Sequence, residues 1–184
     1  MTEGVSDELL SWLGRFNPRT DIERRDVDAV LTLAAAGSPW SRATPLHVTG
    51  SALIVHPASR RVLLRWHDRQ QAWLQVGGHA DAGEHDPLAV ALREGAEETG
   101  LADLRPWPDA ALQHLVIVPV PANTREPAHR HADLRFFLAT GHPDLVRPES
   151  ESAILRWLSP DEAIALTDED NVKETISRAA ALMT

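Results

Sequence analysis

The sequence predicts an α/β protein in which a mixed β-sheet has helices on both sides and follows an N-terminal helical extension. Apolar residues recur at helical spacing across residues 5–37, whereas short apolar runs between Gly and Pro turns begin at residue 46. A further helical segment, at 86–100, interrupts these strand-like runs. A chain of 184 residues suits one domain with a modest extension. We therefore predict an extension at 1–40 and a larger domain at 41–184.

The composition argues against a disulfide-bonded or membrane-spanning protein. Hydrophobic residues make up 43% of the chain, which is enough for a real core, and there is no cysteine to form a disulfide or a thiolate metal site. The N-terminus lacks a basic start and an apolar signal core, and no run approaches the roughly 18 apolar residues of a membrane span. A cytoplasmic protein without membrane contact is expected. The net charge of −9 argues against general binding of nucleic acids, but not against a phosphorylated small molecule.

Two helices are expected in the extension. Ser6 or Asp7 can cap the first, and Asn17-Pro18 breaks it. Thr20 or Asp21 can cap the second. This helical pair is expected to pack on the larger domain or on a second subunit, which makes a homodimer plausible. A role in capping a substrate is the alternative.

The larger domain shows strand-like runs before and after the 86–100 segment. Short apolar runs bounded by turn residues predict strands, and the first two are close enough to form a hairpin. Two helices are expected at the C-terminal end, the first with Ser159 as its cap and Pro160 in its first turn. The predicted strands are 46–55, 61–66, 72–76, 113–120, 129–140 and 153–158, and the predicted C-terminal helices are 160–166 and 168–182.

The segment at 86–100 has clear helix ends. Asp86 is a good N-cap residue, Pro87 fits the first turn where its missing N–H is not needed, and Gly100 supplies the stop.

Three glutamates share one face of this helix. Glu94, Glu97 and Glu98 stand at positions i, i+3 and i+4, so their carboxylates lie together, repel one another and raise one another's pKa. A bound hard cation such as Mg²⁺, which prefers carboxylate oxygens, turns this repulsion between carboxylates into a net attraction to the ion. The pattern therefore indicates a metal site on one helix, and a solvated acidic face is the alternative.

The same stretch resembles the signature of the Nudix hydrolases, which joins a glycine, a glutamate and a final Arg-Glu-x-x-Glu-Glu-x-Gly run. Two departures are present: one extra residue precedes Arg93, and Gly95 replaces an aliphatic residue. We expect the first to lengthen a tolerant loop and the second to weaken the helix by up to about 1 kcal/mol. The match reads Gly78, five residues, Glu84, eight residues, then Arg93-Glu94-Gly95-Ala96-Glu97-Glu98-Thr99-Gly100-Leu101.

The resemblance implies a Nudix-type α/β/α sandwich over about residues 46–182 and a pyrophosphohydrolase acting on acid anhydrides. The implied reaction is metal-dependent hydrolysis of a diphosphate linkage in a nucleoside diphosphate derivative, with Mg²⁺ or Mn²⁺ as cofactor and a small nucleotide as partner. The expected metal ligands are Glu94, Glu97, Glu98 and the carbonyl of Gly78.

Further roles are assigned to single residues by the same resemblance. Glu94 and Glu97 are candidate catalytic residues, with Glu97 the candidate to take a proton from water. Glu84 and Arg93 are expected to form an orienting ion pair, with an ordinary surface pair as the alternative. Glu149 and Glu151 could add a distal carboxylate, although a plain loop role is the simpler reading.

The run at 129–140 carries polar residues on one face. At period two, His129, His131, Asp133 and Arg135 face one side, while apolar residues face the other and are expected in the core. Either the polar face is solvated, or it borders the catalytic cleft, with Arg135 or a histidine meeting phosphate and Asp133 orienting it. A His-x-His pair can also bind a transition metal, but it needs further ligands.

For the part of the substrate beyond the diphosphate, the sequence offers single candidate residues and no motif. His79 follows the metal-loop glycine directly and is a candidate for substrate contact. Trp66, Trp73 and Phe137 could stack on a base, although aromatic residues more often belong to the core.

Two other functions remain open. One is a catalytically silent nucleotide-binding or regulatory module on the same fold, against which the intact glutamates speak. The other is an isoprenoid diphosphate isomerase, which would need a catalytic thiol that this chain lacks.

Overall fold

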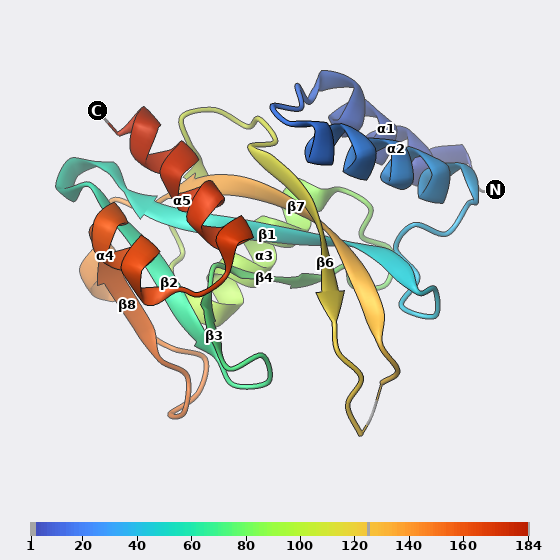
Figure 1. The fold of residues 1–184 in the computed structure, drawn as a ribbon. Helices are drawn as coiled ribbons and strands as arrows, with labels where there is room; N and C mark the ends of the chain where they lie inside the picture. The colour runs from blue at the N-terminus through green and yellow to red at the C-terminus, as the bar shows by residue number, and fades with distance from the viewer. Residues whose placement is uncertain (1–2, 125, 184) are drawn as a thin grey trace.

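The computed structural model describes residues 3–124 and 126–183. Within them the chain forms five α-helices and an eight-stranded sheet (Figure 1). The helices are α1 (Glu3–Arg15), α2 (Asp21–Ala35), α3 (Pro87–Thr99), α4 (Pro160–Leu166) and α5 (Asp170–Leu182). The strands are β1 (Leu46–His56), β2 (Arg61–His67), β3 (Ala72–Leu74), β4 (Val76–His79), β5 (Arg105–Pro106), β6 (His114–Val120), β7 (His129–Ala139) and β8 (Leu155–Leu158).

The sheet is mixed, as predicted. The two longest strands, β1 and β7, run parallel at its centre, and the other pairings are antiparallel. The expected hairpin of β1 and β2 is confirmed by the pairing of Ile54 with Leu63. Strand β4 pairs with β1, and β6 pairs with β7, so that β4 and β6 lie on either side of the central pair.

Two hydrophobic cores lie on opposite faces of this sheet. Because side chains alternate along a strand, Ala52 and Ile54 of β1 enter one core while Leu53 and Val55 enter the other. The first core is covered by α3 together with α1 and α2, and the second by α4 and α5. The α/β/α arrangement predicted from the sequence is therefore confirmed.

The helix ends mostly follow the sequence signals. Thr20 caps α2 by accepting a hydrogen bond from the backbone N–H of Glu23 at 3.1 Å. Asp86 caps α3, and Gly100 ends it with a left-handed backbone at φ 67°. The expected cap of α1 is wrong, because the helix begins at Glu3 and both Ser6 and Asp7 lie inside it.

The N-terminal helical pair packs on the larger domain. Leu9 of α1 and Val30 of α2 are fully buried in the first core. The Trp12 ring meets the edge of Phe136 with 5.1 Å between centroids, and its Nε1 donates to Asp86 Oδ1 at 3.0 Å. The extension thus touches the N-cap of the acidic helix α3. Within the described part of the chain, no helix is both long and apolar enough to cross a bilayer.

Candidate functional site

The three acidic side chains project from α3, which packs against β1 and β4. Close approach depends on glycines in these strands. A Cβ on Gly50 would lie 2.5 Å from the carbonyl oxygen of Pro87, and a Cβ on Gly78 would lie 2.4 Å from Glu94 Oε1. At Gly50 the clash would be with helix backbone, so only glycine lets α3 lie this close to β1, whereas at Gly78 the absent Cβ leaves room for the Glu94 carboxylate.

Arg93 holds the acidic face together. Its Nε donates to both oxygens of Glu84 at 3.0 and 3.1 Å, and its Nη1 donates to Glu94 and to Glu97, each at 3.0 Å. Its Nη2 donates to the carbonyl oxygen of His79 at 2.8 Å. Glu84 and Arg93 therefore meet although the loop between them has one extra residue. Hydrogen bonds from the guanidinium lower the pKa of Glu84 and raise that of Arg93.

Glu98 lies deeper than its neighbours. It accepts a hydrogen bond from the backbone N–H of Gly77 at 3.2 Å and lies 3.3 Å from Arg65 Nη1. Burial raises its pKa to about 7, and burial also raises the pKa of Glu94. Arg65 also pairs with Glu149, so one guanidinium contacts both this loop carboxylate and Glu98 of the acidic helix.

The donor set of α3 fits a divalent cation. Carboxylate oxygens are the ligands that Mg²⁺ prefers, and two of the three glutamates carry desolvated charge that a cation would compensate. Each carboxylate contacts an arginine: Glu94 and Glu97 contact Arg93, and Glu98 contacts Arg65. The side chain of Glu97 is 57% exposed, so it can turn toward a ligand without unpacking the helix.

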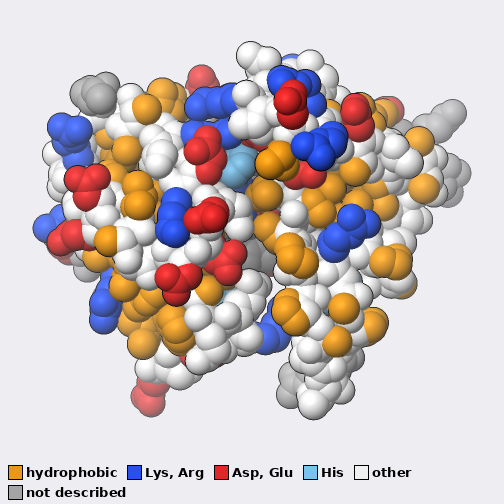
Figure 2. Space-filling view, in the orientation of Figure 1, with side chains coloured by type: hydrophobic (Ala, Val, Ile, Leu, Met, Phe, Trp, Pro, Cys, Tyr) orange, Lys and Arg blue, Asp and Glu red, His pale blue; other side chains and the backbone are white. Residues whose placement is uncertain are grey.

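A cavity of about 480 Å³ opens on the other face of β4. It lies between the β2–β3 turn and the β6–β7 hairpin, where Figure 2 shows the molecular surface hollowed. Its lining includes Gly77, Gly78 and His79, and therefore the same backbone that contacts Glu94 and Glu98 from the opposite side. The backbone of Gly77 and Gly78 thus separates the cavity from the acidic helix, and none of the three glutamates is among the residues that line the cavity.

The polar face of β7 borders this cavity. His131, Asp133 and Arg135 line it, and the last two are only 5% and 2% exposed. The alternative of a solvated outer face is therefore wrong for these residues. The reason is that β1 and the hairpin partner β6 flank β7, and α5 covers the side chain of Arg135. The opposite face of β7 is core, as predicted, with Leu134 and Phe136 buried.

Asp133 and Arg135 form a buried polar network. Arg135 Nε donates to Asp133 Oδ2 at 2.7 Å, and its Nη2 donates to Asn171 Oδ1 of α5 at 2.7 Å. Asp133 also accepts hydrogen bonds from Thr49 at 2.9 Å and from Ser51 at 2.6 Å. The charge of this arginine is thus neutralised inside the protein, and its position is fixed by both the sheet and α5.

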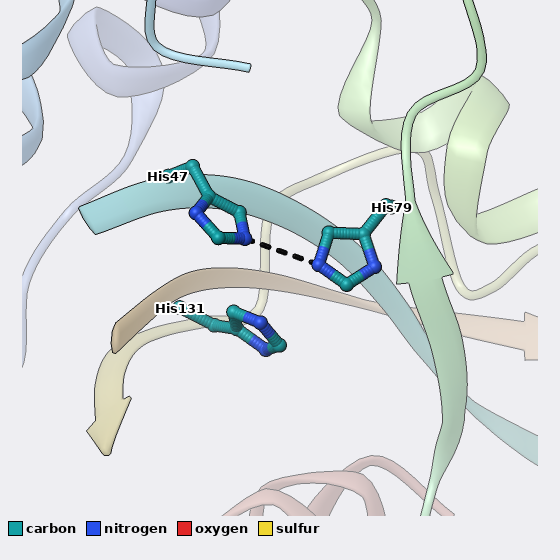
Figure 3. A group of neighbouring side chains, drawn as sticks. All are labelled: His47, His79 and His131. Atoms are coloured by element: carbon teal, nitrogen blue, oxygen red, sulfur yellow. Dashed lines mark hydrogen bonds between the residues drawn. The ribbon is translucent and has the colours of Figure 1, made fainter. Parts of the chain in front are cut away.

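Histidine rings gather at one end of the same face. In Figure 3 the rings of His47, His79 and His131 converge from β1, β4 and β7. One ring nitrogen from each lies within 4.8 Å of the others. Burial lowers the pKa of His79 to about 3 and of His131 to about 4, and it also lowers the pKa of His47.

None of the proposed stacking aromatics is among the residues that line the cavity. Phe137 is 1% exposed in the second core, which excludes a stacking role. Trp66 and Trp73 pair across β2 and β3 with 5.7 Å between ring centroids.

Several lining residues were not predicted, although the sequence held a signal for some of them. Thr49 and Ser51 line the cavity and, with His47 of the histidine group, alternate with apolar or small residues in β1, which is the period-two pattern of a polar strand face. Parallel pairing brings these three opposite His131, Asp133 and Arg135 respectively. Gln75 and Asn171 also line the cavity, and no local pattern marks them.

Comparisons with known proteins agree with this architecture. A sequence model of the family described as "NUDIX domain" matches residues 45–179. No curated protein sequence matches the chain. Among solved structures, the *E. coli* dihydroneopterin triphosphate pyrophosphohydrolase is similar, with 24% identity and a TM-score of 0.58 over 73% of this chain and 94% of that one.

Two further solved structures share the fold. A hydrolase of the NUDIX family from *Clostridium perfringens* has 24% identity and a TM-score of 0.59 over 75% of this chain and 98% of its own. A *C. elegans* Ap4A hydrolase has 19% identity and a TM-score of 0.57 over 73% and 95%. These likenesses show the α/β/α fold.

Proposed function

The chain belongs to the NUDIX domain family, and on that basis we propose that it is a pyrophosphohydrolase that cleaves a diphosphate linkage in a nucleoside diphosphate derivative with Mg²⁺, or Mn²⁺ in its place. One observation carries this proposal. The backbone of Gly77 and Gly78 lines the cavity on one face of β4 and lies against Glu98 and Glu94 on the other, and we propose that a ligand seated in the cavity extends its phosphates past these glycines to the carboxylates.

Glu94, Glu97, Glu98 and the carbonyl of Gly78 would hold the metal ion. When bound, such an ion neutralises the charge of the diphosphate and acidifies a water molecule. Glu97 is the most exposed of the three carboxylates, which suits the proposed role of accepting the proton of that water.

Glu84 and Arg93 would position this machinery. The guanidinium contacts two of the proposed metal ligands and the backbone next to Gly78, and Glu84 anchors it through both carboxylate oxygens. Arg93 thereby fixes the separation between the acidic helix and the glycine strand.

The cavity would take the part of the substrate beyond the diphosphate. Gln75 Oε1 is buried there and has no hydrogen-bond partner among the described residues, so it can accept a hydrogen bond from a substrate N–H or O–H. His79 and His131 line the same space and are proposed to contact the substrate. Arg135 is proposed to contact the substrate only through guanidinium N–H groups that do not already donate to Asp133 or to α5.

A substrate screen with Mg²⁺ tests the function. The panel holds nucleotide sugars, dinucleoside polyphosphates, NADH, ADP-ribose and modified nucleoside triphosphates, and release of a monophosphate product is the expected result. Glu97→Gln combined with Glu98→Gln should reduce turnover below detection while circular dichroism stays unchanged. Glu8→Gln, which changes an exposed carboxylate of α1 outside the site, should keep full activity.

Two results would contradict the proposal. One is full turnover in the Glu97→Gln, Glu98→Gln protein. The other is tight binding of a nucleotide with no turnover across the panel and several metals, which would instead support a silent binding module.

Three further expectations belong with this function. We propose a cytoplasmic protein whose domains divide at residues 1–40 and 41–184. We also propose a homodimer, because Leu10 of α1 and Ile22 and Leu31 of α2 are exposed on the N-terminal helices. Sedimentation velocity of the full chain measures this, and a concentration-independent monomer would contradict it.

A further inference from the structure

Four histidines that no step of the proposed hydrolysis requires as a set lie together beside the cavity. The cluster consists of His47, His79, His129 and His131. Adjacent ring centroids lie 4.8 to 5.3 Å apart, which places each imidazole against at least two others. Because the four imidazoles pack together on one face of the sheet, nitrogen atoms of neighbouring rings face each other.

The outer two rings have fixed tautomers. His47 Nδ1 lies 3.1 Å from the carbonyl oxygen of Thr44, and His129 Nδ1 lies 2.9 Å from that of Pro127. A carbonyl oxygen only accepts, so each Nδ1 carries the hydrogen and, in the neutral ring, each Nε2 carries a lone pair.

These lone pairs face into the cluster. His47 Nε2 lies 3.1 Å from His79 Nε2, and His129 Nε2 lies 3.1 Å from His131 Nε2. Donation of the far ring N–H to a backbone carbonyl is also the arrangement that metal-binding histidines commonly show, because it orients the ring and raises its basicity. His47 and His129 therefore have the environment of ligands.

We propose that His47, His79 and His131 bind one transition-metal ion of the zinc class, at a site separate from the glutamates of α3. Their ring nitrogens lie within 4.8 Å of one another (Figure 3). Tetrahedral zinc with N–Zn distances of about 2.0–2.1 Å places its nitrogens about 3.3–3.4 Å apart. The His47–His79 pair is already near that spacing, and rotation of the His131 side chain supplies the rest.

The ligand type selects the metal. Imidazole suits Zn²⁺, Co²⁺, Ni²⁺ and Cu²⁺, whereas Mg²⁺ prefers the oxygen ligands of α3. His129 stands behind His131 and can orient it or serve as a fourth ligand. Three protein ligands leave one position for water or a substrate donor atom, and His79 and His131 both line the cavity.

Charges around the cluster permit a cation. Arg42 and Arg69 act on these histidines electrostatically, but both pair with Glu126, at 2.6 and 3.4 Å respectively. The carboxylate of Asp133 attracts positive charge toward His131, while Arg135 pairs with that carboxylate at 2.7 Å. The field of the nearby arginines is therefore partly cancelled.

Metal binding by the full chain tests the inference. The protein is stripped with a chelator, and Zn²⁺ uptake is measured by calorimetry and by thermal unfolding, with Mg²⁺ alone as the comparison. One equivalent of Zn²⁺ should bind and raise Tm, and Co²⁺ should give visible absorption bands typical of nitrogen ligation.

Variants locate the site. His131→Asn should weaken Zn²⁺ binding at least about a hundredfold, since even mutation of residues that hydrogen-bond to metal ligands lowers metal affinity about 10–100-fold. His47→Asn should do the same, and circular dichroism checks that each variant folds. His142→Asn, which changes an exposed histidine outside the cluster, is the matched control and should bind like the unaltered chain.

The glutamate double variant separates the two sites. The Glu97→Gln, Glu98→Gln protein should lose hydrolysis and keep Zn²⁺ binding. Zn²⁺ affinity in the folded His131→Asn protein equal to that of His142→Asn would overturn the inference, and so would loss of Zn²⁺ binding in the glutamate variant.

Discussion

Arg93 shows how one side chain can organise an acidic helix. Its guanidinium reaches Glu84, Glu94, Glu97 and the carbonyl oxygen of His79 at the same time. Five N–H donors in a rigid plane make this possible, and the three donors of a lysine at the end of a flexible chain do not reproduce it.

Arg93→Lys is therefore expected to be a damaging substitution. The charge stays, but the bidentate contact with Glu84 and the link to the His79 backbone are lost, so the glutamates lose their positions. We expect kcat to fall about 10–100-fold in the range typical of residues that orient metal ligands. Steady-state kinetics against a substrate found in the screen measures this. Arg147→Lys, which changes an arginine outside the site, is the control, and equal kcat in both variants would contradict the positioning role.

Gly95 is explained by its surroundings. A Cβ at this position would lie 3.0 Å from Leu104 Cδ1 and 3.5 Å from Leu138 Cδ1. Leu104 thus fills the space that a larger aliphatic residue at position 95 would need. The helix gives up about 1 kcal/mol of intrinsic propensity here, and the neighbouring leucines supply the apolar packing instead.

At the scale of helices, a buried ion pair ties the extension to the C-terminal helix. Arg178 of α5 donates to Glu23 of α2 at 2.7 Å, and the two side chains are 2% and 3% exposed. The same Nη1 donates to the carbonyl oxygen of Gln113, next to β6. Helices from the two ends of the chain thus meet through one guanidinium.

Removing one partner of this pair should cost more than the pair itself contributes. Glu23→Ala leaves Arg178 buried without its main partner, and we expect the free energy of unfolding to drop by about 3–5 kcal/mol. Urea denaturation measures the change, with Glu8→Ala at an exposed position of α1 as the control.

The double variant Glu23→Ala, Arg178→Met sharpens this test. Because it removes both charges, it should recover part of the lost stability. A double variant less stable than Glu23→Ala alone would argue that Arg178 acts mainly through Gln113 and Glu174.

At the scale of the whole molecule, buried histidines make folding sensitive to acid. His114 is the first residue of β6 and is 5% exposed, with its Nδ1 2.8 Å from Thr175 Oγ1 of α5. Burial, together with the positive charges of Arg135 and Arg178, lowers its pKa to about 2. In the unfolded chain its pKa returns to about 6.5, so between these values the unfolded chain binds the extra proton.

Stability should therefore fall as the pH drops below about 6.5. His114 alone accounts for about 2 kcal/mol between pH 7 and pH 5, by linkage with the two pKa values. His114→Asn removes that part of the pH dependence, whereas His142→Asn leaves it in place. Urea denaturation at both pH values, with a chelator present, measures the difference. Equal pH dependence in the unaltered chain and in His114→Asn would contradict this account.

The sequence by itself determined the local features of this protein. Helix α3 and its ends, the hairpin of β1 and β2, and the shared face of Glu94, Glu97 and Glu98 all follow from neighbours within a few residues. Capping, turn preference and side-chain periodicity act at that range, so reading the chain in order was sufficient. The start of α1 was missed because Ser6 and Asp7 are good cap residues by type, whereas the helix extends upstream of both to Glu3.

Only the tertiary structure decided which residues of distant strands become neighbours in the sheet. The pairing of β1 with β7 joins residues more than 80 positions apart and brings His47 to His131 and Thr49 to Asp133. Burial of Asp133 and Arg135, and the convergence of the histidines, depend on that register and on α5. Register between distant strands is set by the packing of both cores together, and a strand read alone does not contain that information.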